Sequence, residues 1–253
     1  MKDLTNIMKC TFRSRVWLTI VLGSMLALLA INTPLLAGKG NAGNPKILPP
    51  QSRAHGGTYS EWAGAWWRWA YSLPGGEDQN PVQDPTGDLA GLGQSGPVWF
   101  LAGSFGETVT RTVTLPPGKT LFFPIINTVW VNLPDYGDDP WSDEQRDFAR
   151  EVIAPFIDGA FNLSCQIDGV EVMNIENYRC TTQDGDEYMI TFPEDNLWGL
   201  PPGVYGPSVD DGIYLMVAPL PPGQHTIRFT AETFDFWGNP FALDVTYDLT
   251  VKK

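Results

Sequence analysis

Segments that alternate strictly between apolar and polar residues constrain the fold of this chain more than any other feature. In residues 108–115 four threonines alternate with three apolar residues and Arg111, and residues 243–251 alternate in the same way. A side-chain period of two is that of a β-strand with one buried face. Because Pro-Pro-Gly at 116–118 and 221–223 separates such segments, the pattern predicts a mainly β protein with short turns.

The number of such segments indicates an antiparallel β-sandwich, immunoglobulin-like or jelly-roll-like, with one or two short helices. Strands are expected at 98–102, 108–115, 119–131, 161–172, 178–182, 188–192, 213–218, 225–231 and 243–251. Helices are expected at 61–71, after a capping Thr58 or Ser60, and from Ser142 to about Ile153. Residues 58–253 are then a single sandwich domain that opens with a tryptophan-rich helix and contains a long loop at 73–97.

The N-terminal 37 residues have the pattern of a secretory signal peptide. Four basic residues precede a leucine-rich apolar stretch, and small residues follow as far as Ala37, where cleavage is expected. An uncleaved anchor is the alternative, since residues 16–37 are long enough to span a bilayer. Residues 38–57 are predicted to be a flexible leader. The protein is therefore expected to be secreted or periplasmic, with no membrane span after cleavage.

Net charge restricts the partners. The full chain carries −13, and residues 1–37 carry +3 from four Lys/Arg and one Asp, so the remainder carries −16. Such a surface has no basic footprint that could release counterions from nucleic acid, and it repels anionic lipid. Divalent cations, cationic partners and neutral glycans remain compatible with it.

The cysteines agree with export. Cys10 lies in the signal segment, which leaves Cys165 and Cys180 as one even pair. A disulfide between them would close a loop of about 15 residues and contribute roughly 3 kcal/mol in the chain-entropy model. A metal site is the alternative, but no histidine lies near either cysteine.

Tryptophan is abundant, with nine residues after position 37 and four between 62 and 69. Trp62, Trp66 and Trp69 share one helical face, which predicts packing against the sandwich. Trp67 points away from that face and is the stronger ligand candidate, since indole rings stack on sugar rings. The candidate ligand-binding residues are Trp67, Trp130, Trp141, Trp198 and Trp237.

Acidic residues gather in glycine-containing loops. Calcium takes six to eight oxygen ligands from carboxylates and loop carbonyls. The candidate metal ligands are Asp135, Asp138, Asp139, Asp184 and Asp186. Neither group matches a complete calcium-loop pattern, and Asp is also favoured in turns because its side chain bonds the backbone.

Catalytic signatures are few. The two histidines, His55 and His225, cannot form a three-histidine zinc site, and no Gly-x-Ser-x-Gly elbow is present. Paired carboxylates could hydrolyse glycosides, but acidic residues are too numerous to single out a pair. No catalytic residue is assigned. Arg111 falls on the inward face of its predicted strand, where a buried guanidinium needs a carboxylate partner. The alternative is a position at a strand end or a sheet edge, from which the long side chain reaches water.

Two resemblances add to this reading. Residues 222–231 and 245–251, with the Gly-Asn turn between them, resemble the last two strands of bacterial immunoglobulin-like modules. The segments 66–70, 93–103, 117–127 and 219–227 are similar to a family of uncharacterised exported bacterial proteins. The second resemblance covers most of the chain after the signal segment and implies the domain boundaries but no activity.

The leading hypothesis is an exported, non-enzymatic β-sandwich that binds a glycan or another extracellular surface component, with calcium as a candidate cofactor. An extracellular polysaccharide hydrolase that uses two carboxylates is one alternative. A structural envelope or matrix protein is another, in which strands 108–115 and 243–251 form edges for assembly.

Overall fold

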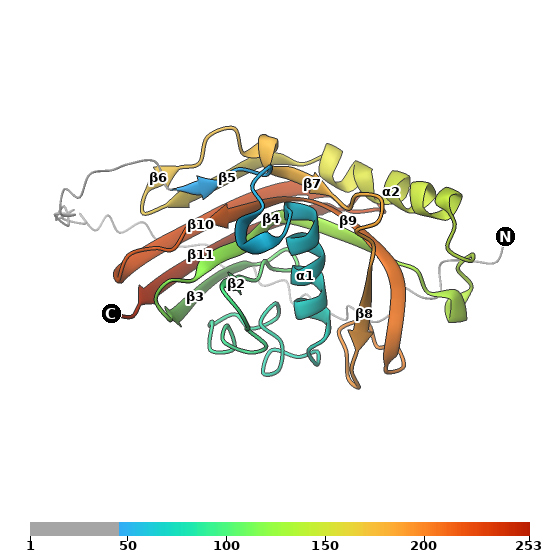
Figure 1. The fold of residues 1–253 in the computed structure, drawn as a ribbon, viewed down its shortest axis with the longest axis horizontal. Coiled ribbons are helices and arrows are strands. Elements are labelled where there is room, and N and C mark those ends of the chain that lie inside the picture. Colours follow the sequence, from blue (N-terminus) through green and yellow to red (C-terminus); the bar gives the residue numbers. More distant parts are fainter. Residues whose placement is uncertain (1–45) are drawn as a thin grey trace, which may run out of the picture. The chain divides into compact units, whose positions relative to one another are not determined.

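The computed structural model describes residues 46–253, which form a mainly β structure with two α-helices and two sheets (Figure 1). The helices are α1 (Tyr59–Tyr71) and α2 (Asp143–Asp158). The strands are β1 (Ile47–Leu48), β2 (Val98–Phe100), β3 (Thr108–Leu115), β4 (Thr120–Val131), β5 (Phe161–Ile167), β6 (Val170–Glu171), β7 (Arg179–Thr181), β8 (Tyr188–Phe192), β9 (Gly203–Val217), β10 (Gly223–Phe234) and β11 (Pro240–Val251).

Both sheets are mixed. The first has the order β1-β9-β4-β2, with β7 and β8 also paired to β9, and the second has the order β3-β11-β10-β5-β6. Pairs β2–β4 and β3–β11 are parallel, so the expectation of purely antiparallel pairing is wrong at two places. In neither pair does a tight turn join the two strands, so no turn forces them to run antiparallel. The predicted β10–β11 hairpin is confirmed and pairs Gly223 with Val251 through Phe234 with Pro240.

The first sheet is covered on both faces. One core lies between the two sheets and includes Phe123, Leu215 and Phe229, whereas Phe122 and Tyr214 face the other way, toward α1. The long strands β4 and β9 are therefore almost continuously buried. This double coverage explains why residues 119–131 read as an apolar run and not as an alternating strand.

Helix α1 starts at a capping box. The Thr58 hydroxyl accepts a hydrogen bond from the Glu61 backbone N–H, and the Glu61 carboxylate accepts one from the Thr58 N–H. These bonds satisfy two of the free donors at the helix start. The predicted helix and its capping by Thr58 are confirmed.

The expected disulfide is wrong, since Cys165 and Cys180 are both free thiols in the structure. Cys165 lies on β5 in the core between the two sheets, and Cys180 lies on β7 against the side chains beneath α1. The two cysteines thus belong to different sheets and to different apolar clusters. Spacing along the chain carried no information about this separation.

Arg111 is buried, as its inward register predicts, with only 1% of its surface exposed. The expected carboxylate partner is wrong: the guanidinium donates to the backbone carbonyls of Val82, Asp84, Ala102 and Gly103 and to the Tyr247 hydroxyl. Two of these carbonyls belong to loop 73–97. Arg111 therefore holds that loop against the second sheet.

Only one of the two strands expected to form edges does so. Strand β11 lies between β10 and β3, so residues 243–251 have strand neighbours on both sides and the edge expectation is wrong there. Strand β3 is at the end of its sheet, and its threonine face is exposed. The loop covers part of this edge, where the Thr112 N–H donates to the Thr86 carbonyl.

The signal segment and the first part of the leader, residues 38–45, lie outside the described residues. The last part of the leader packs on the domain, because β1 pairs with β9 and the His55 ring bonds the Thr120 hydroxyl. Among residues 46–253, no helix combines the length and apolarity that crossing a membrane would need.

Candidate functional site

A cavity of about 200 Å³ lies beside a β-bulge in β4. Pro124 pairs with Tyr214 and Ile126 with Ile213, so Ile125 is the extra residue that interrupts the β4–β9 ladder. Proline has no N–H to give to a ladder, and in an inner strand it is confined to such bulges. The sequence Phe-Pro-Ile-Ile-Asn thus builds the irregularity from which the cavity opens.

On the side of β4 that faces away from β9, the neighbouring strand β2 is too short to pair with all of β4. It pairs with β4 only as far as Phe122. In the described part of the chain, no strand pairs with β4 on this side from Phe123 onward, and the connection after β2 turns away through Gly103, Ser104 and Phe105. Residues 124–129 of β4 therefore form one wall of the cavity, and Gly103 to Phe105 form part of another.

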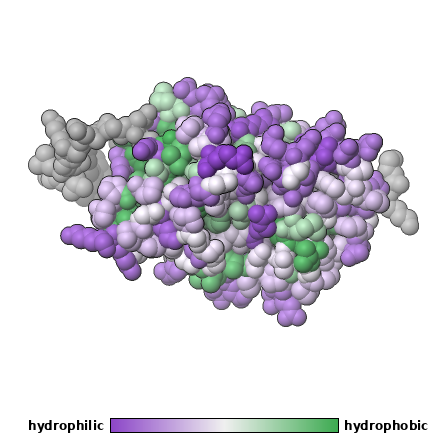
Figure 2. Space-filling view, in the orientation of Figure 1, coloured by the Kyte–Doolittle hydropathy of each residue, from purple (hydrophilic) through white to green (hydrophobic). Residues whose placement is uncertain are grey.

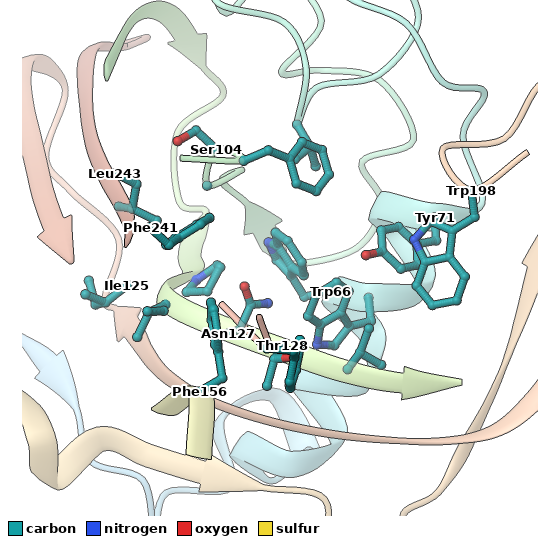
Figure 3. A pocket seen from close by; sticks show the side chains of 18 residues that line it. Trp66, Tyr71, Ser104, Ile125, Asn127, Thr128, Phe156, Trp198, Phe241 and Leu243 are labelled. Atoms are coloured by element: carbon teal, nitrogen blue, oxygen red, sulfur yellow. The ribbon is translucent and has the colours of Figure 1, made fainter. Parts of the chain in front are cut away.

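The lining is dominated by aromatic side chains from distant parts of the chain. Tyr71 and Trp198 lie at one end of the cavity, Phe241 and Leu243 at the other, and Asn127 between them (Figure 3). The lining residues are Trp66, Trp67, Tyr71, Val82, Gly103, Ser104, Phe105, Pro124, Ile125, Ile126, Asn127, Thr128, Val129, Phe156, Trp198, Phe236, Phe241 and Leu243. None of them carries a charged side chain.

Helix α1 contributes two tryptophans, Trp66 and Trp67, to the lining of the cavity, and hydrogen bonds hold both rings in place. Trp66 Nε1 donates to the Leu101 carbonyl at 2.9 Å, and Trp67 Nε1 donates to the Tyr214 hydroxyl at 3.0 Å. The two rings meet edge to face, with centroids 5.0 Å apart. Because both indole N–H groups already have partners, these rings offer a ligand their apolar faces and edges.

A buried polar network lies behind Trp67. The Tyr214 hydroxyl donates to Asp210 at 2.7 Å, and the hydroxyls of Thr182 and Tyr188 donate to the same carboxylate at 2.7 and 3.2 Å. Burial raises the pKa of the Asp210 carboxyl to about 6, although these hydrogen bonds act to lower it. Neither Asp210 nor Tyr214 lines the cavity, but the Tyr214 hydroxyl connects Asp210 to the lining residues Trp67 and Asn127.

Besides the Tyr71 hydroxyl, Ser104, Asn127 and Thr128 bring hydroxyl or amide groups to the cavity. Ser104 Oγ is engaged with the backbone of Glu107, both as donor and as acceptor. Asn127 Nδ2 makes a long contact of 3.4 Å to the Tyr214 hydroxyl. Within residues 46–253, no protein group bonds to the Asn127 side-chain oxygen or to the Thr128 hydroxyl, so these two atoms keep their hydrogen-bonding capacity for a ligand.

Aromatic residues at the β10–β11 turn continue the lining to the surface. Phe236 is 50% exposed and stacks on Phe156, with ring centroids 5.9 Å apart, and its neighbour Trp237 is 64% exposed. Phe105 is exposed on the other part of the rim. Figure 2 shows a mainly hydrophilic face with separate apolar areas, which fits an acidic protein whose apolar surface is concentrated locally.

The structure brings together two of the five predicted ligand-binding tryptophans, Trp67 and Trp198. The expectation that Trp67 lies away from the buried face of its helix is wrong, since it is only 6% exposed. Trp130 and Trp141 pack near α2 instead, where Trp130 contacts Phe148. Trp237 lies on the turn next to the rim and is not part of the lining.

The predicted metal ligands do not converge. Asp184 pairs with Arg150 at 2.7 Å, and Asp138 accepts the Leu133 N–H at 2.7 Å. Across residues 46–253, no three His, Cys, Asp or Glu side chains are grouped so that they could hold a metal ion. Asp135 and Asp139 stay in the segment before α2, whereas Asp184 and Asp186 follow β7.

Sequence reasoning missed most of the cavity, including Phe105, Asn127, Phe156 and Phe241. One signal was present: Pro124 interrupts an apolar run that otherwise reads as an inner strand. Comparison with protein-family models, with curated protein sequences and with solved structures finds no match.

Proposed function

We propose that this chain is an exported, non-enzymatic binding protein whose ligand occupies the aromatic cavity beside β4. The observation that carries the proposal is the lining itself, a cavity of about 200 Å³ walled by aromatic and aliphatic side chains, with a few polar groups. Ligand sites in proteins have this composition, since apolar walls supply affinity and a few polar atoms set orientation. Export is inferred from the pattern of residues 1–37.

We further propose that the ligand is a glycan or a glycan-bearing component of a cell surface. Flat aromatic faces suit the C–H side of a sugar ring, and Trp66, Trp67 and Trp198 are three of the aromatic residues that line the cavity. The exposed Phe236 and Trp237 extend the aromatic surface beyond the rim, along the path that a longer chain would follow. The acidic surface favours a neutral ligand over an anionic one.

Binding is favoured over hydrolysis by the position of the carboxylates. Asp210 and Asp211 are adjacent and buried, but Asp211 is engaged by Arg179 through two hydrogen bonds, and Asp210 lies behind Tyr214. Glycoside hydrolysis needs two carboxyl groups on either side of the scissile bond. The lining residues offer none. The immunoglobulin-like or jelly-roll-like topology and the resemblance to exported bacterial proteins stay predictions.

Intrinsic tryptophan fluorescence of the purified protein, titrated with a panel of neutral oligosaccharides, tests the proposal. A saturable shift is expected, because three lining residues are tryptophans. A Cβ on Gly103 meets no atom within 4 Å, so Gly103→Leu fills the cavity without backbone strain. Gly91→Leu is the matched control, since its Cβ meets only Trp99 at 3.9 Å and it lies outside the lining.

The proposal predicts that Gly103→Leu loses the fluorescence shift and that Gly91→Leu keeps it. Equal titration curves for the two variants would place the binding site elsewhere on the protein. A flat response of the unmodified protein to every oligosaccharide would contradict glycan binding.

A further inference from the structure

The absence of charged side chains from the lining limits the charge of the ligand portion that can enter the cavity. None of its side chains is Asp, Glu, Lys, Arg or His, and Asp210, the carboxylate behind Tyr214, already receives three hydroxyl donors. A charged group transferred into such a site would lose its hydration without gaining a counter-ion. The ligand portion that enters the cavity is therefore uncharged.

The volume limits this portion to one ring. A cavity of about 150 Å³ holds a benzene molecule. At about 200 Å³, the present cavity accommodates a single six-membered ring with small substituents, and two linked rings would exceed it. A chain-like ligand must then enter by its end, with the remainder leaving over the exposed Phe105 and Phe236 at the rim.

Hydrogen-bonding capacity limits the number of hydroxyl groups on that ring. Ser104, Trp66 and Trp67 are already engaged with protein groups. Asn127, Thr128 and Tyr71 supply the lining side-chain oxygens that have no hydrogen-bond partner in the protein within residues 46–253. Each further hydroxyl buried against the aromatic wall would lose its bonds to water, which weakens binding by roughly tenfold or more.

Resting on the proposed function, we propose that the cavity binds the terminal ring of a neutral glycan and that this ring is poor in free hydroxyls, as in a 6-deoxyhexose or an O-methylated hexose. A methyl group in place of a hydroxymethyl or hydroxyl group would pack on the indole and phenyl rings of the wall. Asn127, Thr128 and the Tyr71 hydroxyl would bind the hydroxyls that remain.

Isothermal titration of the purified protein with three methyl glycosides tests the inference: a 6-deoxyhexoside, the parent hexoside and the corresponding hexuronide. The 6-deoxyhexoside is expected to bind about tenfold more tightly than the hexoside, and the hexuronide is expected to show no measurable binding. A phenol of similar size forms a fourth arm, because an aromatic ring has the same flat apolar faces.

Two variants separate the inference from the proposed function. Gly103→Leu is expected to abolish binding of the 6-deoxyhexoside, and Gly91→Leu is expected to retain it. Thr128→Val, which is nearly the same size as the original, is expected to weaken binding about tenfold through the loss of one hydroxyl. Retained binding in Gly103→Leu would overturn the cavity as the site, and with it the proposed function.

Cavity-dependent binding in which the hexoside or the hexuronide is preferred would overturn this inference alone. Tighter binding of phenol than of any glycoside would overturn the assignment to a sugar. Absence of binding in all four arms would overturn both the inference and the proposed function.

Discussion

The Arg111 side chain carries a positive charge into the interior of the protein, where backbone carbonyls surround it. It donates five hydrogen bonds, and within residues 46–253 it forms no ion pair with a carboxylate. Four of the acceptors are carbonyls of residues 82–84 and 102–103, which belong to segments without regular structure. The inward register was readable from the sequence, but the acceptors come from loops whose folding the pattern did not describe.

Replacement of Arg111 by Met is expected to destabilise the protein by about 3–5 kcal/mol, because several buried carbonyls lose their donor. Urea unfolding of the variant measures this. Arg228→Met is the matched control, since Arg228 lies on the same sheet but forms an exposed pair with Asp244. Its cost is expected to stay below about 1 kcal/mol. Equal costs for the two variants would contradict the role assigned to Arg111.

The buried Asp210 makes stability depend on pH. Its pKa is raised from 3.8 to about 6 in the folded protein, chiefly by burial. The folded state then binds a proton that the unfolded state has released between about pH 4 and pH 6, so this group's contribution to stability falls as pH rises through that range.

Relative to Asp210→Asn, the unmodified protein is expected to lose about 2 kcal/mol of unfolding free energy between pH 4 and pH 7. Urea unfolding at several pH values measures the difference, and subtraction of the variant removes the contributions of other groups. Parallel pH profiles for the two proteins would show that the Asp210 pKa is not raised.

Among the helices and strands, the sequence predicted those whose ends are set by residues close together in the chain. The hairpin of residues 223–251 and the helix after Thr58 are confirmed, because a turn and a capping box specify them. Strand β9 begins at Gly203, ten residues before the expected strand at 213–218, since Gly-Val-Tyr-Gly-Pro reads as a turn. Its pairing with β8 is a tertiary effect that the residues alone do not signal.

Helix α1 shows why the ligand candidate Trp67 was misplaced. Spacing assigned one buried stripe to this helix, but nine of its 13 residues are buried. Trp67 packs on Tyr71 and bonds Tyr214, and the neighbouring Gly64 faces the Tyr188 ring. A helix surrounded on several sides buries residues that lie off its main apolar face.

The capping box gives a prediction for this element. Thr58→Ala removes the acceptor for the Glu61 N–H and is expected to cost about 1 kcal/mol of stability. Thr58→Ser keeps the hydroxyl and is expected to retain most of the stability that the cap contributes. Thermal unfolding of both variants compares them, and an alanine variant as stable as the serine variant would show that the cap contributes nothing.

At the scale of the whole molecule, the two sheets separate the cysteines that spacing along the chain had paired. Cys165 faces the core between the sheets, whereas Cys180 faces the α1 side. Burial raises the pKa of both thiols, that of Cys180 to about 12, which keeps them protonated and slow to react while the protein is folded.

A Cys10→Ser variant isolates this pair. After denaturation without reductant, the protein is expected to show two reactive thiols per chain, from Cys165 and Cys180. Thiol titration with a chromogenic disulfide reagent measures the number. A value of zero would mean that these cysteines form a disulfide and that their separation in two clusters is incorrect.

The sequence pattern did not predict the cavity, because its walls come from α1, β4, α2, β11, the β10–β11 turn and three loops. Only the tertiary arrangement brings these segments together. Of the predicted ligand residues, Trp67 and Trp198 are in its lining, whereas Trp130, Trp141 and Trp237 are not.

The most direct measurement follows the indole N–H signals of the tryptophans by nuclear magnetic resonance while a neutral oligosaccharide is added. If the ligand binds in the cavity, the signals of Trp66, Trp67 and Trp198 shift together and saturate, and those of Trp130 and Trp141 stay in place. Shifts confined to Trp130, Trp141 or Trp237, with the three lining indoles unchanged, would contradict binding in the cavity.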